Sequence, residues 1–300
     1  MKSRLFTILF FITGLLSICL FLTNCTNTSA DKYLENGIEK YRQGDFQGAL
    51  ELYNKAIEID SKNANAYNNR GLVKDNLGDY YGAIEDYNKA LSISKDDATC
   101  YFNRGLAKSH LGDYRGAIGD YDKSISLNPN DADAYCNRGL VRYDIGDYKG
   151  AIADNNAAIR ISPKYDKAYN NRGLAKSHLG DYKQAIEDYN IAIEINPKFA
   201  EPYNNRGLAY IDLGDYKLAI EDCEVALRLN PKFVEAYNNR GLAKSYLDDY
   251  NSAIVDYNKA IEIKPDFAIP YYNRGIAKEK LGDKSGAQQD YDKYNELKGK

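Results

Sequence analysis

Residues 66–93 read AYNNRGLVKDNLGDYYGAIEDYNKALSI, and this stretch decides the fold. Apolar residues in its second half recur at intervals that place them on one face of a helix. These residues are Ala83, Ile84, Tyr87, Ala90 and Leu91. Between the two halves, Gly78 suits the left-handed conformation that ends a helix, and Asp79 can cap the helix that follows. The stretch therefore predicts two helices joined by a tight turn.

The tripeptide Asn-Arg-Gly shows that this pattern is repeated along the chain. It recurs every 34 residues, at 69–71, 103–105, 137–139, 171–173, 205–207, 239–241 and 273–275. One period before the first copy, Asn36 and Gly37 form a degenerate version. The repeats, numbered 1 to 8, are 30–63, 64–97, 98–131, 132–165, 166–199, 200–233, 234–267 and 268–300. Because no residues separate the repeats, we expect no linker and no second domain within 30–300.

Further positions are shared by every repeat. Position 4 is Tyr and position 8 is Gly in all eight copies, and position 20 is always Ala. This pattern resembles the tetratricopeptide repeat family over residues 30–300. The resemblance implies an all-α fold, a right-handed α-solenoid of eight helix-turn-helix repeats. The Gly at position 8 and the Ala at position 20 would let the two helices of one repeat pack closely.

Composition excludes several classes of protein. The formal net charge of −3 provides no basic surface for nucleic acid. With only 2 His, the chain offers no His-rich metal site, and it lacks a phosphate-binding loop and a nucleophile elbow. We therefore expect no enzymatic activity, no cofactor, no metal and no small-molecule substrate.

Residues 1–24 differ in character from the repeats. Lys2 and Arg4 begin an export-signal pattern that continues as an uncharged apolar run over residues 5–22. The run is also just long enough to span a bilayer. Cys25 follows the run, with Asn24 where a small residue is usual, and the segment resembles a bacterial lipobox in which Cys25 becomes lipidated.

Three interpretations of this leader remain open. Residues 1–24 are the signal peptide of a lipoprotein anchored through Cys25, an uncleaved signal anchor, or a plain cleaved signal peptide. All three place residues 26–300 outside the cytoplasm, and the first two anchor the chain to a membrane of the cell envelope. Residues 25–31 would then form a short tether before the first repeat.

Arginine at position 7 and aspartate at position 23 occur together in repeats 2 to 8, and repeat 1 lacks both. Pairing between adjacent repeats would leave one member without a partner at an end of the array. We therefore expect each Arg to pair with the Asp of its own repeat, for example Arg172 with Asp188. The competing interpretation is a row of arginines for anionic ligands, but a paired Arg has few donors left. Position 11, where the family usually has Tyr, is mostly Lys.

Asparagine at position 6 forms the candidate binding site. The resemblance implies that this position faces the concave groove, and an amide can both donate to and accept from a peptide backbone. The candidate groove residues are Asn69, Asn103, Asn137, Asn171, Asn205, Asn239 and Asn273. We expect them to form a row facing solvent, with the apolar residues of position 9 beside them. The alternative is that these amides only solvate the groove.

The few His and Cys residues favour structural interpretations. His110 and His178 share position 13 but lie two repeats apart, too far for one metal ion, and we expect exposed residues at the groove rim. Cys223 replaces a core Tyr and should be a buried small apolar residue. A disulfide between Cys100 and Cys136 would need demanding geometry, and we do not favour it.

These observations predict a non-enzymatic scaffold that binds one or more proteins or peptides. An extended segment of the partner would lie in the concave groove, where the residues at positions 2, 5, 9, 12 and 13 vary between repeats as recognition pockets would. The alternative is a structural envelope protein that associates through its convex face or its ends.

Overall fold

The computed structural model describes residues 29–299, which form sixteen α-helices and no strand. The described chain divides into two compact units, one ending at Asp113 and the other beginning at Tyr114. The N-terminal unit contains α2 (Ser29–Arg42), α3 (Phe46–Ile59), α4 (Ala64–Asn76), α5 (Tyr80–Ile93) and α6 (Ala98–His110).

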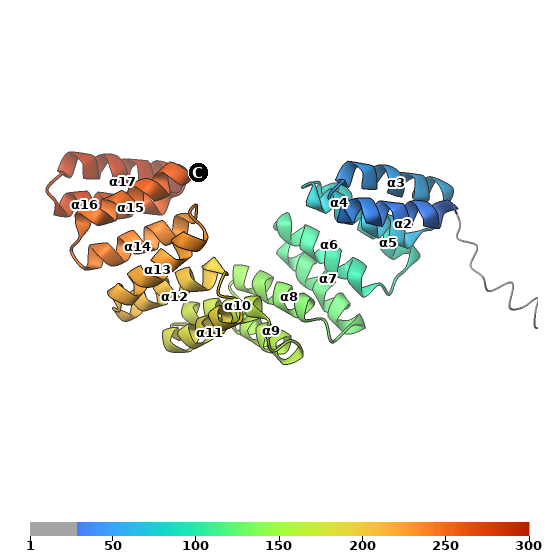
Figure 1. The fold of residues 1–300 in the computed structure, drawn as a ribbon, viewed down its shortest axis with the longest axis horizontal. Coiled ribbons are helices and arrows are strands. Elements are labelled where there is room, and N and C mark those ends of the chain that lie inside the picture. Colours follow the sequence, from blue (N-terminus) through green and yellow to red (C-terminus); the bar gives the residue numbers. More distant parts are fainter. Residues whose placement is uncertain (1–28, 300) are drawn as a thin grey trace, which may run out of the picture. The chain divides into compact units, whose positions relative to one another are not determined.

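The C-terminal unit contains the remaining helices (Figure 1). They are α7 (Tyr114–Leu127), α8 (Ala132–Asp144), α9 (Tyr148–Ile161), α10 (Asp166–His178), α11 (Tyr182–Ile195), α12 (Ala200–Leu213), α13 (Tyr216–Leu229), α14 (Val234–Tyr246), α15 (Tyr250–Ile263), α16 (Ala268–Lys280) and α17 (Lys284–Lys298). The all-α fold of eight helix-turn-helix repeats is thus confirmed. The leader at 1–24, the lipidation site Cys25 and residues 26–28 of the tether lie outside the described residues.

The two helices of a repeat are held close by the glycine at position 8. In α10, a Cβ on Gly173 would lie 2.6 Å from the ring of Tyr189, which projects from α11 at position 24. The Tyr189 ring is fully buried. Gly37, Gly71, Gly241 and Gly275 stand in the same relation to a tyrosine at position 24 of their repeats. The expected close packing is therefore confirmed for position 8.

The turn within each repeat has the predicted glycine conformation. Gly78, for example, has φ +82°, and Asp248, which replaces the glycine in repeat 7, is also left-handed with φ 61°. The prediction that the aspartate after this glycine caps the second helix is confirmed in some repeats and not in others. Asp79 accepts a hydrogen bond from the Gly82 amide, but Asp181 and Asp215 make no such bond. The residue at position 19 is Gln or Leu in those two repeats, whereas a glycine there leaves space for the Asp carboxylate.

The first helices of successive repeats form the inner surface of each unit. In the C-terminal unit, α8 contacts α10, α10 contacts α12, α12 contacts α14 and α14 contacts α16. Among the described helices of each unit taken by itself, no second helix contacts the second helix of the next repeat. The stack is therefore tighter on the side of the first helices, which makes that side concave.

No helix between Ser29 and Gly299 is long and apolar enough to cross a membrane.

Candidate functional site

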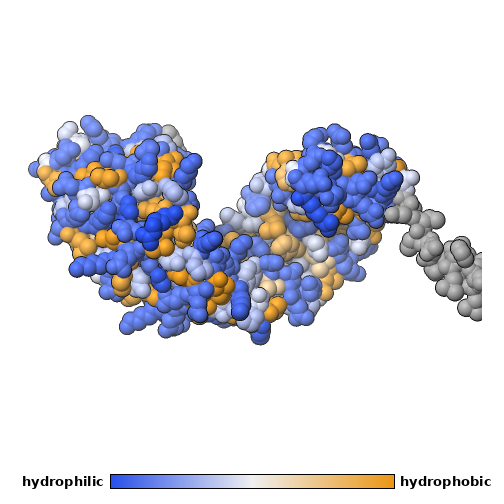
Figure 2. Space-filling model, viewed as in Figure 1, coloured by the Kyte–Doolittle hydropathy of each residue, from blue (hydrophilic) through white to orange (hydrophobic). Residues whose placement is uncertain are grey.

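The candidate site is the concave surface of the C-terminal unit, formed by α8, α10, α12, α14 and α16. Position 6 of each of these helices carries one of the predicted groove asparagines. The residues at positions 5 and 9 lie about one turn apart along the same helix and flank the asparagine. The sequence therefore places a row of amides beside a row of apolar side chains on these helices. Figure 2 shows apolar residues interspersed with hydrophilic ones on the surface of the unit.

The groove asparagines bond to one another across the repeats. Asn205 Nδ2 donates to Asn170 Oδ1 at 2.9 Å, and Asn170 Nδ2 donates to Asn171 Oδ1 at 3.4 Å. Asn239 and Asn273 donate in the same way to Asn204 and Asn238 of the preceding repeats. The result is an amide chain running from Asn273 through 238, 239, 204, 205 and 170 to Asn171, whose Nδ2 lies 3.4 Å from Cys136 Sγ.

This amide chain changes the expected role of position 6. Asn239 and, in the N-terminal unit, Asn103 are buried, and the other five groove asparagines are half-buried. Asn103 donates to Asn68, so the pattern recurs there. The expectation that these amides face open solvent is wrong for Asn103 and Asn239, which are buried and bonded to an amide of the preceding repeat. An interrepeat bond uses one of the two N–H groups of an amide, and the second remains a possible donor to a ligand.

Asn137 differs from the other groove asparagines of this unit. Its Nδ2 donates to the carbonyl oxygen of Asp133 in its own helix at 2.8 Å. The preceding turn of α8 therefore holds the Asn137 side chain, which takes no part in the amide chain.

The apolar row at position 9 is accessible. Leu140 and Leu208 each expose about two fifths of their surface, at 39% and 40%. Leu174 and Leu242 are half-buried. These side chains provide apolar contact area beside the asparagines.

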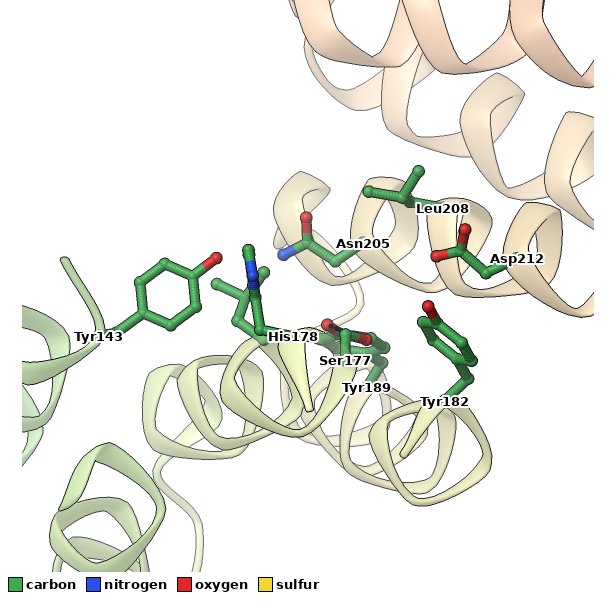
Figure 3. A pocket seen from close by; sticks show the side chains of 9 residues that line it. Tyr143, Ser177, His178, Tyr182, Tyr189, Asn205, Leu208 and Asp212 are labelled. Atoms are coloured by element: carbon green, nitrogen blue, oxygen red, sulfur yellow. Dashed lines mark hydrogen bonds between the residues drawn. The ribbon is translucent and has the colours of Figure 1, made fainter. Parts of the chain in front are cut away.

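A pocket of about 310 Å³ opens between α10 and α12 (Figure 3). Leu174 and Leu208 form apolar walls, and Asn205 supplies an amide from the groove row. The remaining lining comes from the side chains of Tyr143, Ser177, His178, Tyr182, Tyr189 and Asp212.

Aromatic stacking closes some interfaces between repeats and leaves this one open. Tyr148 stacks on His178 with ring centroids 4.8 Å apart, and Tyr216 stacks on Tyr246 at the same distance. In the N-terminal unit, Tyr80 packs against His110 at 4.7 Å. In each pair a ring at position 17 meets a ring at position 13 of the next repeat. Tyr182 is also at position 17 but faces Asp212, and no ring stacks on Tyr182 within residues 29–299.

The carboxyl group of Asp212 lies at the exposed end of the pocket. Partial burial raises the pKa of Asp212 above its ordinary value of 3.8. The same cause raises the pKa of Asp144, at position 13 of α8. Desolvation disfavours a charged carboxylate, so a bound cation would relieve this cost.

Six position-7 arginines are paired with the aspartate of their own repeat, as predicted. Arg172 donates to both oxygens of Asp188, at 3.0 Å and 2.5 Å, and the same double contact recurs at Arg70, Arg138, Arg206, Arg240 and Arg274. Arg172 Nη1 also donates to Asn156 of the preceding repeat at 2.7 Å, and the guanidinium lies 5.2 Å from the centre of the Tyr169 ring. These arginines join the repeats and have little capacity left for an anionic ligand.

The basic residue at position 11 was an unexplained departure from the family pattern. In the structure it is a second partner of the same aspartate, as Lys176 Nζ lies 2.8 Å from Asp188 Oδ2. Position 11 follows position 7 by one helical turn, so both cations reach one carboxylate. Burial raises the pKa of Asp290, but hydrogen bonds from Arg274 and Lys278 outweigh it and lower that pKa overall.

His110 and His178 are exposed, as expected. In the described part of the chain, no group of His, Cys, Asp and Glu is arranged to hold a metal ion. Cys136 and Cys223 are buried free thiols, and Cys100 is buried as well. Burial raises the pKa of Cys136 to about 11 and that of Cys223 to about 12, so both thiols stay protonated near neutral pH.

Comparison with known families gives matches along the repeats. A family model described as TPR repeat matches residues 37–75, 110–146, 139–177, 178–214 and 246–282. A second, described as tetratricopeptide repeat, matches 64–97 and 200–233. No curated protein matches the chain.

Solved structures are similar in fold. A tetratricopeptide repeat protein from Parabacteroides merdae is 23% identical with a TM-score of 0.66, covering 85% of this chain and 98% of its own. The APC/C hetero-tetramer Cut9–Hcn1 contains a chain 18% identical with a TM-score of 0.69, covering 93% of this chain and 55% of its own. The C-terminal part of a TPR repeat-containing protein from Cytophaga hutchinsonii is 20% identical with a TM-score of 0.57, covering 77% of this chain and 95% of its own. At these identities the similarity shows the fold alone.

Proposed function

This chain belongs to the tetratricopeptide repeat family, and from that premise we propose that it is a scaffold that holds an extended segment of a partner protein in its concave groove. Proteins of this family bind other proteins or peptides. The observation that carries the proposal is the combination of amides at position 6 with accessible leucines at position 9 on one surface. The amides offer hydrogen bonds to a peptide backbone, and the leucines offer apolar contact to its side chains.

The interrepeat amide chain supports this proposal in a modified form. Asn171 and Asn205 are fixed by their neighbours before any ligand binds, so a bound backbone need not immobilise them. Asn137 is fixed by its own helix. The groove thus presents oriented polar groups, and the ordering cost of binding falls mainly on the ligand.

The test uses a positional-scanning library of fluorescent decapeptides and the full chain. We expect Asn137→Ala combined with Leu208→Ser to weaken peptide binding about tenfold, through one lost neutral hydrogen bond and lost apolar contact. Neither change touches the amide chain, so circular dichroism should remain as in the parent protein. Fluorescence polarisation provides the affinities.

Val255→Ser is the matched control. Val255 exposes 65% of its surface on the second helix α15, and its replacement should leave peptide affinity unchanged. If Val255→Ser weakens binding of the peptides and the groove changes do not, the rival function is favoured. That function is a structural envelope protein that associates through its convex face.

We further propose that the scaffold acts outside the cytoplasm, tethered to the cell envelope by a lipid on Cys25. The supporting observation is the leader sequence, with Lys2 and Arg4 before an apolar run that ends three residues before Cys25. Mass spectrometry of the mature N-terminus should find a chain that begins at a lipid-modified Cys25. A mature chain that retains Met1 would contradict the lipoprotein and leave the signal anchor.

A further inference from the structure

The pocket between α10 and α12 has a charge and shape that the peptide groove alone does not explain. Of the side chains that line it, Asp212 is the only carboxylate, and neither Lys nor Arg lines it. Figure 3 shows the hydroxyl end of Tyr182 pointing toward the Asp212 carboxylate, with Leu208 above them and Asn205 to the left, both on α12. The pocket is therefore acidic at one end and aromatic and apolar elsewhere.

One aromatic side chain of this pocket, Tyr182, is available to a ligand, whereas Tyr189 is fully buried and His178 is stacked on Tyr148. Tyr182 has no stacking partner within the described chain, unlike Tyr148 and Tyr216 at the equivalent position of the neighbouring repeats. The hydroxyl oxygen of a tyrosine can accept a hydrogen bond from a cationic N–H group, and a long basic side chain can lay its methylene groups along apolar walls. Here Leu174 and Leu208 are those walls.

We propose that this pocket binds a lysine or arginine side chain of the extended segment, with its cationic end between Tyr182 and Asp212. The proposal rests on the proposed function, because it assigns one residue of a peptide already placed in the groove. An acidic or phosphorylated side chain would meet the carboxylate of Asp212 without a counter-charge. A purely aliphatic side chain would contact the apolar walls but leave the Asp212 carboxylate partly desolvated and without a counter-charge.

Sequence differences along the groove make the preference local. Asp212 is at position 13 of repeat 6. The residue at the same position of repeat 8 is Lys280, in α16. The equivalent place beside α16 is thus charged with the opposite sign. A basic residue of the ligand is expected opposite α10 and α12 and not opposite α14 and α16.

Asp212 can be changed without disturbing the fold. It makes no hydrogen bond or ion pair with another residue between Ser29 and Gly299. Asp212→Asn keeps its shape and removes its charge. The matched control is Asp266→Asn, an exposed position in the turn between α15 and α16, which removes the same charge away from the pocket.

The experiment uses the decapeptide pools described above, with one position fixed as Lys, Arg, norleucine or Glu. We expect the Lys and Arg pools to bind about tenfold more tightly than norleucine, and Glu to bind weakest. Asp212→Asn should abolish the difference between Lys and norleucine, whereas Asp266→Asn should preserve it.

Two kinds of failure are distinguishable. If peptides bind and the groove variant Asn137→Ala with Leu208→Ser weakens them, but Lys and norleucine bind equally, the pocket assignment is wrong and the groove function stands. The assignment is also wrong if Asp212→Asn keeps the preference for Lys. If no pool binds the chain, both the groove function and the pocket assignment are wrong.

Discussion

Asp188→Ala is expected to destabilise the C-terminal unit by about 3–5 kcal/mol. Asp188 is nearly inaccessible, with 3% of its side chain exposed, and it faces Arg172 and Lys176, which are 17% and 16% exposed. Removing the carboxylate leaves two largely buried cations without a counter-charge. Repulsion between them adds to the desolvation cost.

The repeats contain a matched comparison for this prediction. Position 11 is Tyr210 in repeat 6, so Asp222 is bonded by Arg206 alone. Asp222→Ala therefore leaves one cation unpaired and should cost less than Asp188→Ala. Changing Glu262, whose ion pair with Lys259 is exposed, should have no measurable effect.

Urea unfolding and hydrogen exchange would measure these differences. Exchange in Asp188→Ala should increase first in α10 and α11 and in the helices that contact them, because each repeat depends mainly on its neighbours. Equal unfolding midpoints for Asp188→Ala and the parent protein would contradict the assigned role of the pair.

Gly173→Ala is expected to destabilise the same unit by about 2 kcal/mol. The new methyl group would lie 2.6 Å from Tyr189 Cε1, in a ring that is fully buried and cannot turn away freely. The intrinsic helix preference for Ala over Gly, about 1 kcal/mol, offsets part of the cost. The net loss remains because two helices must separate or the ring must leave its position.

Gly207→Ala provides the control for this substitution. Position 24 of its repeat is Cys223, and the nearest atom to the added methyl group is Cys223 Sγ at 3.2 Å. The stabilisation from the helix preference of Ala over Gly then nearly offsets the cost of the tighter contact with Cys223. We therefore expect little change in the unfolding midpoint. A Gly173→Ala protein as stable as the Gly207→Ala protein would show that the tyrosine ring does not set the helix spacing.

The repeat pattern was sufficient to predict the fold because the contacts that make a repeat are local and recur eight times. Gly173 and Tyr189, or Arg172 and Asp188, lie 16 residues apart in one hairpin. Because both members of each pair recur together from repeat to repeat, the sequence alone indicates that they are in contact. Lys176 could also have been assigned, because it follows Arg172 by one helical turn and faces the same carboxylate.

The candidate site was less predictable because it depends on contacts between repeats. Asn205 reaches Asn170 only through the rotation that relates successive hairpins, and no pattern within one repeat fixes that rotation. The pocket at Asp212 arises in a similar way. It exists because position 13 carries a carboxyl group where the neighbouring interfaces carry a second ring.

The alternation of ring-stacked and open interfaces has a consequence at the level of the gene. Position 13 is a ring at His110, His178 and Tyr246 and a polar chain at Asn76, Asp144, Asp212 and Lys280, so from repeat 2 to repeat 8 this position has a period of two repeats. Residues 104–114 and 172–182, which are 68 positions apart, are identical. Recombination that removes or inserts 34 codons would place two interfaces of one kind in succession. An exchange of 68 codons preserves the alternation.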